Sequence, residues 1–200
     1  MWRKLGKPYK FIAAFLGIAG LLLIFWKIIA LLYLHLLVAI AKPIWSVFNS
    51  PVQLEIRDNI LRFIYLQISP EPMSFSVNKS DEIYLNLILV VSLYSALWII
   101  VKKKILYPFL VSLGILFVVH ELILYLYSYT GIWEFADSLD YNSQKELLNN
   151  ILNLFPKVKA NLFNQLIFHW NAWGWDVVPL ILWLGGAYKL ILPEITKKKR

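Results

Sequence analysis

The chain has 200 residues, of which 60% are hydrophobic, and it carries a formal net charge of +8. A soluble domain is closer to about half apolar, so this composition argues against an ordinary globular protein. The basic residues gather at the ends of apolar runs, without interleaved aromatics, which argues against a nucleic-acid-binding protein. The chain has no cysteine, and this excludes disulfides, thiolate nucleophiles and cysteine-based metal or iron–sulfur sites.

The first predicted element is a membrane span over residues 11–32. About 20 apolar residues, each rising ~1.5 Å, are enough to cross a ~30 Å hydrocarbon core. A basic stretch precedes the run, and the run is too long for a signal peptide, so we expect an uncleaved anchor. The chain then stays apolar to Ile40, and we expect a tilted or interfacial helix over residues 34–41 that stops at Lys42-Pro43.

Residues 48–80 are predicted to form a small extracytoplasmic β-like insertion. Apolar and polar residues alternate over residues 51–57, which is the period of a half-buried strand. Asp58-Asn59 is a turn signal, residues 61–68 are rich in strand formers, and residues 74–77 alternate again. The pattern also allows a helix over residues 60–66.

Two further spans, over residues 83–101 and 105–128, are predicted to form a helical hairpin. Lys102, Lys103 and Lys104 join them, and we expect these lysines to form a cytoplasmic tip. Pro108 falls in the first turn of the second arm, where proline is tolerated.

An extracytoplasmic, amphipathic helical insertion is predicted over residues 140–170. Ser143 and Glu146 have the spacing of a capping box, and apolar residues follow at helical spacing up to Pro156. A more apolar segment over residues 160–170 is expected to lie on the membrane surface. The last span is predicted over residues 175–192, ending at Pro193 and a basic tail.

These elements predict an all-α polytopic membrane protein with four transmembrane helices, folded as one integral membrane domain over residues 1–200. Bases dominate the two ends and the lysine tip, whereas most acids fall in the two insertions, which predicts that both termini are cytoplasmic. We expect the protein in the bacterial inner membrane. Tyrosines and tryptophans around residues 125–133 and 173–175 are expected to form an outer aromatic belt.

Three residues form a candidate intramembrane polar site: Lys27, His120 and Glu121. An ionised side chain at their depth costs about 2 kcal/mol or more unless it is paired or reaches the headgroups. One hypothesis is an ion pair between Lys27 and Glu121. The alternative is that Lys27 extends to the outer headgroups while Glu121 hydrogen-bonds to water there.

A second group of residues is expected at the outer rim of the membrane: His169, Trp173, Gly174 and Asp176. The aromatic stretch around them either closes a lipid- or peptide-facing groove or is a belt entering the last span. The three histidines, His35, His120 and His169, have no i, i+4 ligand spacing, and we expect no metal site, cofactor or catalytic residue. Gly185-Gly186 would permit close helix packing.

This layout resembles the exosortase/archaeosortase membrane proteins, or the accessory membrane proteins that accompany exosortases. His169 with Gly174 lies where the histidine region of that family would be, and residues 176–183 are similar to the entry to the last span of the accessory proteins. The resemblance implies a role in sorting exported proteins. The family enzymes use cysteine, arginine and histidine; this chain has no cysteine, and residues 118–121 replace the arginine, so that transpeptidase chemistry is excluded.

The sequence therefore predicts a non-catalytic accessory or structural subunit of an envelope sorting or export complex, in contact with the lipid bilayer and other membrane subunits. One alternative is a peripheral subunit of an energy-coupling or electron-transfer complex. The other is a small transporter or proton-conducting protein that uses Lys27, Glu121 and His120.

Overall fold

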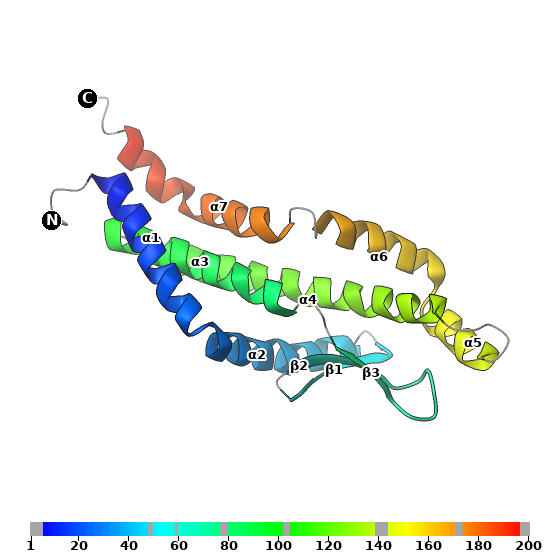
Figure 1. Cartoon of the computed structure of the whole chain (residues 1–200). Helices are drawn as coiled ribbons and strands as arrows, with labels where there is room; N and C mark the ends of the chain where they lie inside the picture. Colours follow the sequence, from blue (N-terminus) through cyan, green and yellow to red (C-terminus); the bar gives the residue numbers. More distant parts are fainter. Residues whose placement is uncertain are drawn as a thin grey trace. The chain divides into compact units, whose positions relative to one another are not determined.

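The computed structural model describes residues 6–47, 50–58, 60–76, 80–101, 105–138, 144–170 and 174–196 (Figure 1). Over these residues the chain is mostly helical, with one small sheet. The elements in chain order are α1 (Lys7–Ile24), α2 (Trp26–Val47), β1 (Val52–Arg57), β2 (Ile60–Tyr65), β3 (Met73–Ser76), α3 (Ser80–Val101), α4 (Leu106–Asp137), α5 (Lys145–Leu154), α6 (Lys157–His169) and α7 (Trp175–Thr196).

Two helices are long and apolar enough to cross a membrane, namely Trp26–Val47 and Leu106–Asp137. The other apolar helical stretches are shorter: Pro8–Ile24, Leu85–Val101 and Val177–Tyr188. Helices form at all four predicted spans, but within the described residues the prediction of four full-length spans is not supported. The capping serine, Ser143, and the lysine tip at 102–104 lie outside the described residues.

The first predicted span, over residues 11–32, is wrong as a single helix. The chain breaks at Phe25, whose φ of −96° and ψ of 12° separate α1 from α2. These dihedrals fall in the sparsely allowed bridge region, and the apolar residues next to Phe25, without a proline, carry no sequence signal for such a break. The predicted stop at Lys42-Pro43 is also wrong, because α2 continues to Val47 with Pro43 inside it. Proline inside a helix removes one backbone hydrogen bond and crowds the carbonyl four residues before it, but α2 continues for one more turn beyond this position.

The chain divides into two compact units. The first unit comprises Met1–Ala30, Asp81–Val118 and Gly174–Arg200, and the second comprises Leu31–Ser80 and Val119–Trp173. Helices α2 and α4 each contribute residues to both units.

The core of the first unit is built around Tyr94 of α3. Its hydroxyl lies 2.7 Å from the Ser112 hydroxyl of α4, and both hydroxyls lie within 3.3 Å of the Leu182 carbonyl of α7. These bonds satisfy polar groups that burial would otherwise leave costly. Gly186 lies directly against Tyr94, so the expected close approach is confirmed for this glycine.

The outward surface of the first unit is apolar. Large side chains such as Leu16, Trp98, Ile115 and Leu184 are about half or more exposed. No charged residue occurs along its helical segments at residues 11–26, 85–101, 106–118 and 177–188. A helix that is apolar on all faces is typical either of a large protein core or of a membrane.

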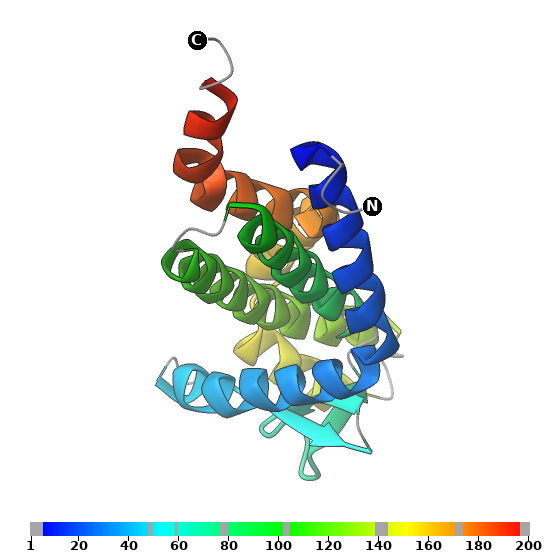
Figure 2. The same ribbon diagram turned by 90° about the vertical axis from the view of Figure 1, so that its left-hand side faces the viewer.

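The second unit contains a three-stranded antiparallel sheet in the order β1-β2-β3. Figure 2 shows its cyan strand beside the blue helix α2. The predicted alternation is confirmed: Val52 and Leu54 are buried, whereas Gln53 and Glu55 are exposed. Asp58 has a φ of 56°, as the turn between the paired Arg57 and Ile60 requires. The helical alternative for residues 60–66 is therefore wrong, and residues 60–65 form β2.

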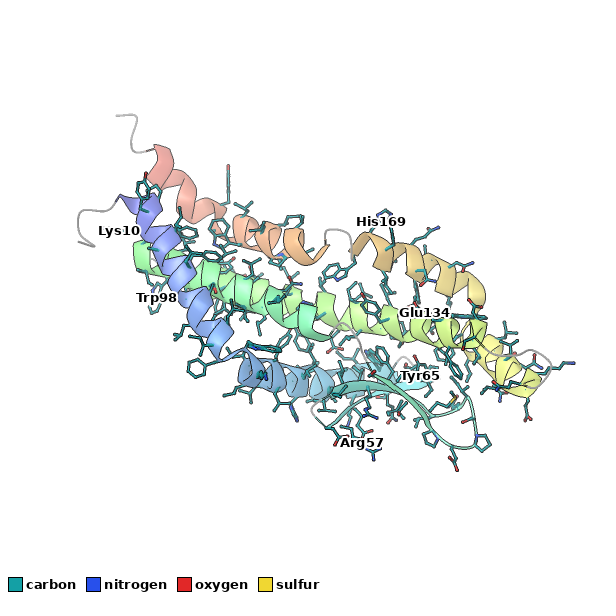
Figure 3. All side chains as sticks on the ribbon, viewed as in Figure 1. Lys10, Arg57, Tyr65, Trp98, Glu134 and His169 are labelled. Atoms are coloured by element: carbon teal, nitrogen blue, oxygen red, sulfur yellow. The ribbon has the colours of Figure 1, made fainter. Side chains whose placement is uncertain are left out.

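Aromatic side chains fill the core of the second unit. Tyr65 of β2 lies between the sheet and α4, where its hydroxyl donates a 2.5 Å hydrogen bond to the Ser128 carbonyl (Figure 3). Burial raises the pKa of the Tyr65 phenol, so this group stays neutral. Its ring contacts Phe155, and Phe155 contacts Tyr129 with 4.9 Å between ring centroids.

The predicted aromatic belt is thus partly a packed core. Tyr129 and Trp133 are each 6% exposed, and the Trp133 indole donates a 3.0 Å hydrogen bond to the Phe155 carbonyl. Aromatic residues with one polar tip suit both settings, so their presence in the sequence does not distinguish a belt from a core.

The two adjacent glycines of α7 offer a matched test of the first unit. A Cβ at Gly186 would meet the Tyr94 hydroxyl, would lie 3.2 Å from Tyr94 Cζ and 3.3 Å from Pro108 Cβ, whereas nothing lies within 4 Å of one at Gly185. We expect Gly186→Ala to destabilise the protein by about 1–3 kcal/mol through overpacking. Gly185→Ala should be neutral or stabilising by up to about 1 kcal/mol because alanine is the better helix former.

Thermal unfolding of the two variants in the same detergent measures this difference. Equal unfolding temperatures for Gly186→Ala and Gly185→Ala would contradict the close packing of α7 on Tyr94.

Candidate functional site

The most distinctive polar group of the chain lies inside the second unit. Tyr33 of α2 and His120 of α4 are in direct contact, with 2.7 Å between the Tyr33 hydroxyl and His120 Nδ1. Their rings meet edge to face with 5.8 Å between centroids. Glu121 follows His120 on the same helix, and all three side chains are buried.

Helical periodicity explains why Tyr33 faces inward. Ala30, Tyr33, Leu37, Ala41 and Trp45 are all buried and recur every three or four residues along α2. On α4, the same spacing places His120 in line with the buried residues Leu116 and Leu124.

Glu121 is the least satisfied member of this group. Its side chain is 7% exposed, and neither carboxylate oxygen has a hydrogen-bonding partner among the described residues. Burying an ionised carboxylate without a partner costs several kcal/mol or more, so an ionised Glu121 at this position would lower the free energy of unfolding. Such a residue in an apolar helix is a functional-site hypothesis by default.

Lys27, the third predicted member, belongs to the first unit, whereas His120 and Glu121 belong to the second. Its side chain is exposed, as the alternative hypothesis expects of a lysine that reaches the headgroups. The described geometry does not decide between the Lys27–Glu121 ion pair and its alternative, and the ion pair stays an untested hypothesis.

The predicted outer-rim residues are not brought together by any described contact. His169 is exposed and projects from α6 (Figure 3). Gly174 is buried at the start of the last helical segment. The Asp176 side chain and all of Trp173 lie outside what the structure describes. The remaining histidine, His35, is exposed, with its Nδ1 2.7 Å from the Leu31 carbonyl.

Among the described residues, no group of three histidine, cysteine, aspartate or glutamate side chains could hold a metal ion. The arrangement that remains is a phenol, an imidazole and a carboxyl in one buried region. A neutral imidazole can accept from or donate to the phenol according to its tautomer, and these three groups are the types that proteins use to pass protons.

Sequence reasoning did not identify Tyr33 as a member of this group. The signal was available, because Tyr33 lies on the same helical face as Leu37 and Ala41.

Comparison with protein-family models, with curated proteins and with solved structures gives no match.

The Glu121 carboxyl can be tested by an isosteric change. We expect Glu121→Gln to leave stability unchanged or to raise it by about 1–2 kcal/mol, because an amide carries no charge to desolvate. The measurement is unfolding of the wild type, Glu121→Gln, Lys27→Met and the double variant in one detergent.

Additive effects of the two substitutions are expected. A loss of stability in Glu121→Gln that disappears when Lys27 is already methionine would contradict this expectation and establish the ion pair.

Proposed function

We propose that this protein is an integral membrane protein that serves as a non-catalytic accessory or structural subunit of an envelope protein-sorting or export complex. The apolar helices of the first unit and the apolar lengths of α2 and α4 would lie within the lipid bilayer. The second unit would present its sheet and its polar helices to the aqueous side. Both termini would be cytoplasmic, in the inner membrane of a bacterium.

One observation carries the membrane part of this proposal: the first unit exposes large apolar side chains over helical segments that contain no charged residue. In water, an exposed apolar surface of this kind would drive aggregation. In lipid it is the favoured surface, and the helices satisfy their own backbone groups. The shorter apolar stretch of α3, 17 residues from Leu85 to Val101, is at the lower limit of a span.

Charged side chains support placing the sheet and α5 of the second unit in water. Glu55 and Arg57 are exposed on β1, as are Lys145 and Glu146 on α5. Scattered charges of both signs are typical of a solvated surface, where ion pairs contribute little to stability.

The subunit role rests on two arguments from the sequence. The layout resembles the accessory proteins of exosortases, and the absence of cysteine removes the nucleophile of the related enzymes. A chain that keeps the membrane layout without the nucleophile fits a supporting role in such a complex.

A second candidate function is proton conduction. It is favoured by the buried contact between Tyr33 and His120, with the Glu121 carboxyl beside it on α4. Ionisable groups inside apolar helices often mark proton pathways.

The subunit proposal is tested by affinity purification of the tagged, full-length chain from native membranes in a mild detergent. We expect at least one other membrane protein in a fixed ratio to the tagged chain. Recovery of the chain alone, as a well-folded and monodisperse species, would contradict the proposal.

The same preparation, reconstituted into liposomes, tests the second candidate. Proton flux that is present in the wild type and lost in Glu121→Gln would support conduction, and the absence of flux from folded wild-type protein would exclude it.

A further inference from the structure

The second unit contains a cleft of about 430 Å³ between the end of α2, strand β1 and the segment after β2. This volume is within the range of small-molecule sites, roughly 300–1,000 Å³. Buried residues form an apolar floor, namely Ala41, Trp45 and Val52, whereas the exposed residues Lys42, Gln53 and Gln67 form a polar rim. The cleft therefore suits a ligand with one apolar part and one polar part.

The charge of the lining suits an anion. Lys42 is the one charged residue that lines the cleft within the described residues, and no carboxylate opposes it there. The amides of Gln53 and Gln67 add donors at the same rim. The Ser50 hydroxyl accepts a 3.3 Å hydrogen bond from the Val52 N–H and keeps its own proton to donate.

An apolar strip leads from this cleft along α2. Ser46 lines the cleft, and Ala39 and Leu32 follow at intervals of seven residues, so all three lie on one face of the helix. Leu36 and Pro43 lie beside them, and all these residues are exposed. His35 lies seven residues before Lys42, on the same side of the helix, and borders the strip with an imidazole, which would not repel an anion as a carboxylate would.

We propose that the cleft binds an anionic phospholipid, with the headgroup phosphate at Lys42 and an acyl chain over the apolar floor and along the strip of Leu36 and Leu32. Lysine is a strongly hydrated point charge that binds phosphate well at an interface, while its stem packs on apolar surface. The apolar strip distinguishes this ligand from a free phosphate ester, which would leave the floor and the strip uncovered. The inference rests on the proposed membrane location and not on the subunit role.

Native mass spectrometry of the full-length, delipidated protein in detergent tests this site. The protein is titrated with phosphatidylglycerol, with phosphatidylcholine of the same acyl chains, and with glycerol phosphate as a competitor. We expect phosphatidylglycerol to bind more tightly than phosphatidylcholine, and equimolar glycerol phosphate not to displace it.

Two lysine variants locate the site. Lys42→Gln should weaken phosphatidylglycerol binding about tenfold, the loss of roughly one charge-assisted hydrogen bond. Lys145→Gln, a matched change at an exposed lysine of α5 in the same unit, should leave binding unchanged. Equal unfolding temperatures for the two variants show that both are folded.

Equal binding of the two lipids, or equal affinities in Lys42→Gln and Lys145→Gln, would overturn the proposal. Displacement of the lipid by equimolar glycerol phosphate would assign the cleft to a soluble phosphate ester instead. Each result is independent of whether a protein partner co-purifies, so failure of this site and failure of the subunit proposal can be told apart.

Discussion

The absence of charge along four helical segments of the first unit is the constraint on which the rest of the structure depends. Four helical segments, including residues 85–101 and 106–118, have no ionised side chain to place in water. In an apolar surrounding, every backbone group must be satisfied within the segment itself, and helices do this. Specificity must then come from packing and from a few internal polar contacts rather than from burial of apolar surface.

The Tyr94 group supplies such contacts in the first unit. Its hydroxyl and that of Ser112 share the Leu182 carbonyl, so α3, α4 and α7 are joined by hydrogen bonds at one point. The absence of a side chain at Gly186 lets Tyr94 reach this point. The hydrogen bonds of Tyr94 therefore depend on Gly186, because any side chain at that position would meet the Tyr94 hydroxyl.

The second unit needs other elements to complete its core, because its sheet is too small to bury its own apolar face. Helices and aromatic rings complete the core: Trp45 of α2 stacks on Phe63 of β2, and Tyr65 packs on Phe155 after α5. The Asn150 amide donates a 3.0 Å hydrogen bond to the Ile68 carbonyl, which ties α5 to the segment after β2. The cleft beside Lys42 lies at the edge of this packing, where α2 ends against β1.

Much of this architecture could be predicted from local patterns. Alternation over residues 51–57 identified β1, and apolar periodicity identified α5 up to Leu154. The break at Phe25 could not be predicted, since its neighbours Ile24 and Trp26 are apolar, no proline lies nearby, and Lys27 is compatible with a continuous helix. The site was found only in part: an acidic residue in an apolar run pointed to Glu121, but the contact of His120 with Tyr33 joins residues 87 positions apart, and only tertiary structure brings them together.

The absence of cysteine permits a direct test of the central claim that lipid, not water, surrounds the first unit. Ile60 of β2 and Ile115 of α4 are matched, with exposed fractions of 43% and 46%. Single cysteines at these positions, in native membranes, are treated with a charged, water-soluble maleimide from the outer side and after permeabilisation. The account predicts that Ile60→Cys is labelled and that Ile115→Cys is not labelled under either condition. Labelling of Ile115→Cys at the rate of Ile60→Cys would contradict it.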